Sequence, residues 1–123
     1  MDSKQSLDVF GEFLVKNLRD KGIGNVETLL SNTSKAPSNL KLQNEISQFN
    51  ESQKELIKEI VIKSIDVAIH DFLFSLQELA DFENNIQISV NGKNIVELSD
   101  GIHGESYSED GWNAKFSQYG RSE

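Results

Sequence analysis

Residues 50–82 contain no glycine or proline and keep one helical periodicity throughout, and this segment constrains the fold more than any other. Asn50 and Gln53 match the capping box of a helix start, in which each side chain hydrogen-bonds to the other residue's backbone. The segment therefore predicts one helix over about 51–81. A helix of that length spans about 45 Å, and its many apolar residues require cover from more than one side.

At about 100° per residue, the side chains of this helix separate into two apolar groups and one polar stripe. The broad apolar arc is expected to face the core and comprises Val61, Ile65, Ala68, Ile69, Phe72, Leu73, Leu76, Leu79 and Ala80. A second apolar strip consists of Leu56, Ile60, Val67 and Phe74. The polar stripe is expected to face solvent, with Asp66 and His70 as a surface pair, and comprises Glu59, Lys63, Asp66, His70 and Gln77.

Shorter helices are expected before the long one. Asp2 and Gln5 form another capping-box pattern, and Gly22 is expected to end this first helix in a left-handed conformation. The expected order is a helix to about residue 21, a short helix capped by Asn25, an exposed loop over 31–38 and a short helix over 40–49.

After the long helix the apolar residues alternate with polar ones, which indicates strands. The Asn-Gly pair at 91–92 is typical of a hairpin turn. Two registers are open: a two-residue turn places Ile95 opposite Ile88, whereas a three-residue loop places Val96 opposite Ile86.

The sheet is expected to contain the hairpin over 86–98 and a third strand over 112–119, where alternation resumes at Trp112. We therefore predict a single α+β domain over 1–123, in which N-terminal helices and a small antiparallel sheet pack around the long helix.

The net charge of −8 is concentrated in one part of the chain, because residues 64–110 contain ten carboxylates, Glu83 among them, against one base, Lys93. Such a field repels nucleic acid and anionic lipid and attracts basic partners. Acidity of this kind also serves solubility alone. Cysteine is absent, and with no signal-peptide pattern at the start this predicts a cytoplasmic protein without disulfides. Charged residues within the long helix argue against a membrane span.

Residues 99–111 combine three glycines with four carboxylates and are the candidate binding loop. Loops carry much of protein recognition, and aromatic residues are frequent anchors in interfaces. The predicted partner-binding residues are Asp100, His103, Glu105, Tyr107, Glu109, Asp110 and Trp112. A solvated glycine-rich turn is the simpler interpretation.

A divalent-cation site at Asp100, His103 and Glu105 is a third interpretation of this loop, but the spacing matches neither an EF-hand nor a zinc-binding helix. No metal or cofactor is predicted. The chain also lacks a phosphate-binding loop and a nucleophile elbow, and the glycines at 22 and 24 follow a helix rather than a strand. We therefore predict that the chain is not an enzyme.

Four segments, 69–78, the hairpin, 99–105 and 109–112, together resemble small uncharacterised bacterial proteins built from a helix, a hairpin and an aromatic strand. The resemblance covers roughly the C-terminal half and implies no activity. The chain is also similar to toxin-immunity proteins in size, acidity and layout.

The predicted function is that of an acidic protein-binding module, an immunity or inhibitor protein that neutralises a basic partner such as a toxin. Two alternatives are a protein that sequesters a small signalling ligand, as phage anti-defence proteins do, and a small enzyme.

Overall fold

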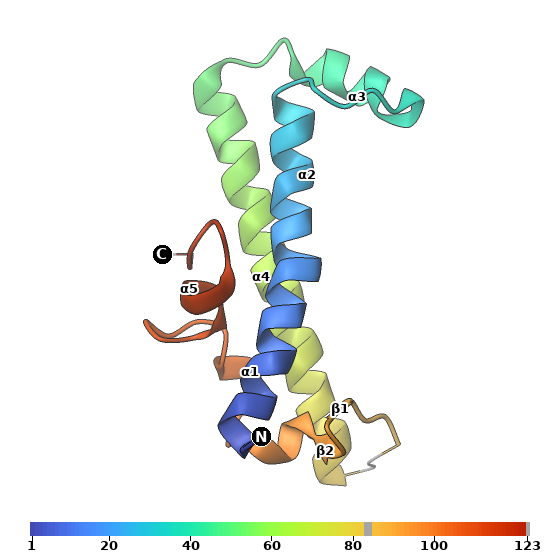
Figure 1. Ribbon diagram of the computed structural model, residues 1–123. Coiled ribbons are helices and arrows are strands. Elements are labelled where there is room, and N and C mark those ends of the chain that lie inside the picture. The colour runs from blue at the N-terminus through green and yellow to red at the C-terminus, as the bar shows by residue number, and fades with distance from the viewer. Residues whose placement is uncertain (83–84, 123) are drawn as a thin grey trace.

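The computed structural model describes residues 1–82 and 85–122, and two long antiparallel helical segments dominate it (Figure 1). Glu83, counted among the ten carboxylates, lies outside the described residues. The predicted long helix is confirmed as α4, Glu51–Phe82. Its capping box is confirmed too: the Asn50 amide donates to Gln53 Oε1 at 2.9 Å, and the Gln53 amide donates to Asn50 Oδ1 at 2.8 Å.

The other long segment is one continuous helix made of α1 (Ser3–Leu14), a π-helical segment η1 (Val15–Arg19) and α2 (Asp20–Leu30). The predicted stop at Gly22 is therefore wrong. A Cβ atom on Gly22 would lie 2.7 Å from Ile65 Cδ1, so glycine here allows α2 to approach α4 closely. The helix ends instead at Leu30, and Asn32, just beyond the cap residue Ser31, takes the left-handed conformation with a φ of 59°.

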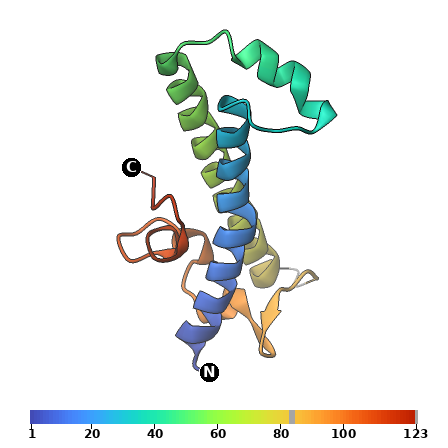
Figure 2. The same cartoon turned by 45° about the horizontal axis from the view of Figure 1, so that its top comes forward.

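The predicted short helix at Asn25 is part of α2, and the connection to α4 carries α3, Pro37–Ile46. Proline at the first helical position explains the start of α3, three residues earlier than predicted. This helix extends away from the end of the α2–α4 pair (Figure 2).

The α+β class is confirmed, with one small antiparallel sheet in the described chain: β1, Ser89–Val90, pairs with β2, Lys93–Asn94. The two-residue turn is the correct alternative, since the Ile95 amide donates to the Ile88 carbonyl at 2.9 Å. The ladder is shorter than the predicted 86–98. The Asn94 side chain accepts from the Val96 amide and starts a 3₁₀-helix, η2, over Ile95–Leu98.

The predicted third strand over 112–119 is wrong, because Trp112–Phe116 forms the short helix α5. Trp112 and Phe116 are four residues apart, so they suit one side of a helix as well as one face of a strand. The Trp112 amide donates to the Glu105 carbonyl at 2.9 Å, which ties the helix start to the preceding loop rather than to β1 or β2.

The main core lies between α1, α4 and the C-terminal segment, which includes the 3₁₀-helix η3, Ile102–Gly104. The Trp112 ring packs edge-on against Phe10 with ring centres 5.8 Å apart, and a Cβ atom on Gly11 would lie 2.4 Å from the indole. The buried core residues are Leu7, Phe10, Val15, Ile69, Leu73, Leu76, Ile95, Val96, Ile102 and Trp112.

Three residues of α4 are on the opposite side from the one predicted, and one of them, Ala68, assigned to the core, is exposed; Ala80 lies outside the residues whose burial is described. Phe72, assigned to the core, is 51% exposed, whereas Asp66, assigned to solvent, is 6% exposed. The reason is that Arg19, on the facing helix, is buried and forms an ion pair with Asp66. The buried side of α4 is therefore turned toward Arg19, and Phe72 is turned outward.

Candidate protein-docking groove

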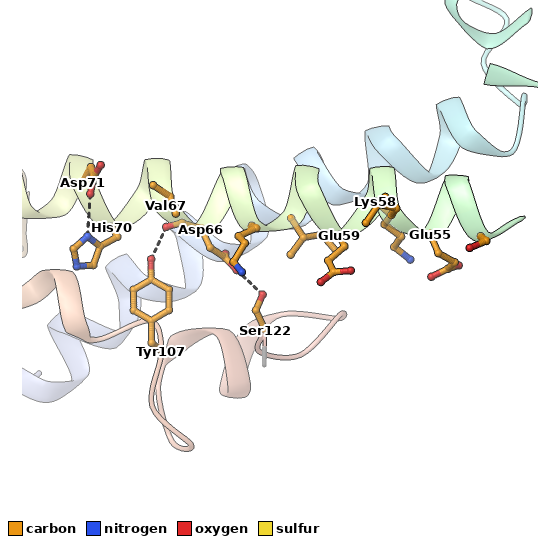
Figure 3. Close-up of a pocket in the computed structure, with 13 residues that line it drawn as sticks. Glu55, Lys58, Glu59, Asp66, Val67, His70, Asp71, Tyr107 and Ser122 are labelled. Atoms are coloured by element: carbon orange, nitrogen blue, oxygen red, sulfur yellow. Dashed lines mark hydrogen bonds and ion pairs between the residues drawn. The ribbon is translucent and has the colours of Figure 1, made fainter. Parts of the chain in front are cut away.

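A groove of about 1030 Å³ runs along α4, and the C-terminal segment forms its other wall (Figure 3). Leu56 and Val67 on α4 give it an apolar surface, while Tyr107 and Ser122 reach it from the opposite wall. Leu56 and Val67 belong to the second apolar strip of the long helix, which the structure leaves exposed.

A buried ion pair fixes the C-terminal wall of the groove. Arg19 is 1% exposed, and its Nε donates to Asp66 Oδ1 at 2.6 Å. Its two terminal nitrogens donate to the Ser117 hydroxyl at 2.9 Å, the Gly120 carbonyl at 2.8 Å and the Ser122 hydroxyl at 3.0 Å. The Ser122 hydroxyl in turn donates to Asp66 Oδ2 at 2.5 Å. The guanidinium therefore holds three residues of the C-terminal tail against α4.

Tyr107 joins the binding loop to the same point on α4, because its hydroxyl donates to the backbone carbonyl of Asp66. Burial, and then the neighbouring Asp66 carboxylate, raise the pKa of Tyr107 to about 12. The hydroxyl is therefore protonated at neutral pH and remains a hydrogen-bond donor.

Both histidines of the chain meet beside the groove. The His70 and His103 rings pack edge-on with centres 5.3 Å apart, and His103 also packs edge-on against Phe74 at 5.1 Å. The expected pairing of His70 with Asp66 is wrong, because His70 Nδ1 lies 3.1 Å from Asp71 Oδ1 and Asp66 is bound to Arg19. This cluster positions η3 on α4.

The groove is acidic once its internal ion pairs are taken into account. Lys58, which lines it, donates to Glu27 at 3.0 Å, and this hydrogen bond lowers the pKa of Glu27. Lys63 is the other lysine in the lining. Within the described chain, Lys63 and the lining carboxylates of Glu55 and Glu59 form no ion pair with each other or with other residues.

The predicted binding residues do not form one site. Tyr107 lines the groove and His103 lies next to it, on His70. Glu105 instead accepts from the Ser99 hydroxyl at 2.8 Å, and Trp112 is 0% exposed in the core, where no partner can contact it. The described lining of the groove excludes the carboxylates of Asp100, Glu105, Glu109 and Asp110.

Sequence reasoning found the second apolar strip and Tyr107 separately but did not bring them together. The missing element was the Arg19–Asp66 pair, which sets the C-terminal segment beside that strip. The only available sign was an arginine with apolar neighbours in the first helix, and this is a common pattern on helix surfaces.

Among the described residues, no three histidine, aspartate or glutamate side chains are grouped closely enough to hold a metal ion. No helix in the described parts of the chain is both long and apolar enough to cross a bilayer. No protein-family model, curated protein or solved structure matches this chain.

Proposed function

We propose that this chain is an acidic protein-binding module that takes a basic, amphipathic segment of a partner protein into the groove. The observation that carries the proposal is the combination, on one side of α4, of an exposed apolar strip with unpaired carboxylates. The strip comprises Leu56, Ile60, Val67 and Phe74, all of which are exposed; Leu56 and Val67 line the groove, and Ile60 and Phe74 continue the strip outside its lining.

The dimensions and spacing of the strip favour a helix as the bound segment. From Leu56 to Phe74 the strip covers about 27 Å, and its residues recur at intervals of four and seven, as in helix-in-groove recognition. A partner helix of about 18 residues would cover it. Apolar side chains on that helix would pack on the strip, and its flanking lysines or arginines would face Glu55, Glu59 and Asp71.

The charge of the groove distinguishes between classes of ligand. Four carboxylates and two lysines line it, and Lys58 and Asp66 are already paired within the protein. A phosphate-bearing ligand or a nucleic acid would meet repulsion from Glu55 and Glu59, whereas a basic protein segment would be attracted. An inhibitor of the immunity type is the role that fits, since covering a basic surface blocks any activity that needs it.

The test uses a synthetic 18-residue helical peptide with leucines on one face and lysines on the other, and a second peptide with glutamates in place of the lysines. Binding rates are measured by surface plasmon resonance at low and at physiological salt. We expect the lysine peptide to bind with an association rate that falls as salt rises, and the glutamate peptide not to bind.

Two triple variants with the same change in net charge provide the control. Glu55→Gln, Glu59→Gln and Asp71→Asn neutralise the groove, while Asp100→Asn, Glu109→Gln and Asp110→Asn neutralise carboxylates of the C-terminal loop that lie outside it. The groove variant should lower the association rate about tenfold and the loop variant much less. Equal effects of the two variants would rule out the groove and leave only a general attraction.

A further inference from the structure

A third face of α4 is at most partly covered by the rest of the chain and lies away from the side that the proposed groove partner would cover. Its positions follow one another at steps of three or four residues, and each of them is exposed or half-buried. We call it the uncharged face; it consists of Ile57, Val61, Ser64, Ala68, Phe72, Ser75 and Leu79. On a helix with about 100° per residue it lies about a third of a turn from the apolar strip and about a third from the buried side.

We propose that a second copy of this chain docks on the uncharged face, with the two α4 helices antiparallel and a twofold axis at Ala68. The face is complementary to itself in this register, because large residues of one copy lie level with small residues or other apolar residues of its partner. The register pairs Ala68 with Ala68, Ser64 with Phe72, Val61 with Ser75, and Ile57 with Leu79. Small residues at the axis allow the two helices to approach closely.

Charge selects a second copy for this face rather than the basic partner of the groove. The chain carries a net charge of −8, so two copies repel each other wherever carboxylates meet. The uncharged face is a strip about 35 Å long without a charged side chain, and there two copies can make contact without opposing carboxylates. A basic segment would find no carboxylate on it.

Charge also selects the antiparallel orientation. Residues 51–63 of α4 contain three glutamates and three lysines, whereas residues 64–82 contain four carboxylates and no base. An antiparallel pair sets the acidic half of each helix beside the neutral half of the other. A parallel pair would set the two acidic halves side by side, which costs free energy through like-charge repulsion.

Single cysteines test the register directly, because the chain has no cysteine of its own. Disulfides form only between residues whose Cα atoms lie within about 7 Å. We expect Ala68→Cys to cross-link two copies under mild oxidation. Ser75→Cys, on the same face, should not cross-link with itself, since its two copies would be about 21 Å apart. A mixture of the Ser75→Cys and Val61→Cys chains should cross-link into a heterodimer.

Sedimentation equilibrium of the unmodified chain should show a dimer whose population rises with concentration. Ala68→Glu places two carboxylates at the axis and should weaken the dimer at least about tenfold. Because Ala68 is exposed, circular dichroism of that variant should be unchanged. Its binding to the lysine peptide should also persist, which separates this proposal from the groove. A monomer at all concentrations, or equal cross-linking by Ala68→Cys and Ser75→Cys, would overturn the proposal.

Discussion

The buried side of α4 and its two open sides carry the reverse of the residue types that burial usually selects. The buried side contains a carboxylate, Asp66, while the open sides expose Phe72, Phe74 and Val67. What decides between them is the neighbouring chain: Arg19 supplies a charge partner for Asp66, and Gly22 lets α2 come close to Ile65. The comparison shows that on a helix with apolar residues on several sides, specific neighbours select the buried side.

The strongest way to break the buried side is to remove its cation. Arg19→Met leaves the Asp66 carboxylate buried without a charge partner and releases the C-terminal tail, so we expect a loss of about 3–5 kcal/mol in the free energy of unfolding. Urea denaturation measures it. The double variant Arg19→Met, Asp66→Leu removes both charges and should recover most of the loss; no recovery would mean that the tail contacts, rather than the ion pair, stabilise this region.

A pair of neighbouring alanine substitutions tests the assignment of sides. Leu73 is fully buried, so Leu73→Ala should cost about 2–5 kcal/mol through lost burial and a residual cavity. Phe72→Ala should cost less than about 1 kcal/mol, because half of that side chain is exposed. Thermal denaturation at low protein concentration, where any dimer dissociates, gives both values. A larger loss of stability for Phe72→Ala than for Leu73→Ala would mean that Phe72 lies in the core.

Gly11, on α1, tests how closely the core packs on the side opposite α4. Gly11→Ala would press a methyl group into the Trp112 ring, and we expect a loss of about 1–3 kcal/mol from overpacking. Gly104→Ala is the matched control, since a Cβ atom there meets nothing within 4 Å. Tryptophan fluorescence should change in the first variant only. Equal stability of the two would contradict the close packing of Trp112 on α1.

The smallest expected effect is at Tyr107, where the variant Tyr107→Phe removes one hydrogen bond and about 1 kcal/mol. Because the folded state raises the pKa of Tyr107 from 10 to about 12, it holds the phenol proton more tightly than the unfolded state does. This stabilisation is complete below pH 10 and is lost as the pH rises toward 12. Tyr119, whose pKa is also raised, acts in the same direction. Denaturation at pH 9 and pH 11 should show a weaker pH dependence in the variant.

Local signals in the sequence predicted much of the fold correctly. Both capping boxes, the length of α4 and the two-residue hairpin turn depend on residues close together in the chain. The predicted third strand at 112–119 is wrong because Trp112 and Phe116, four residues apart, fit one side of a helix as well as one face of a strand.

The candidate site was less predictable, because it depends on contacts between distant parts of the chain. The Arg19–Asp66 pair joins residues 47 positions apart, and Tyr107 reaches Asp66 across 41 positions. Neither contact has a local sequence pattern. Trp112 was therefore proposed as a partner anchor, although Gly11 provides its place in the core.

The π-helical segment η1 also keeps the buried residues before and after it on the same side of the first helix. Leu7, Gly11, Val15, Arg19 and Ile23 are all buried although they recur every four residues. In a regular α-helix each four-residue step drifts by about 40°, so such a series would turn to the far side within a few turns. The extra residue within Val15–Arg19 takes up that drift. Removing one residue from this segment would let it close into a regular α-helix with Arg19 and Ile23 still on the side that faces α4. Removing one residue from α1 instead would rotate Arg19 and Ile23 by about 100°, away from Asp66.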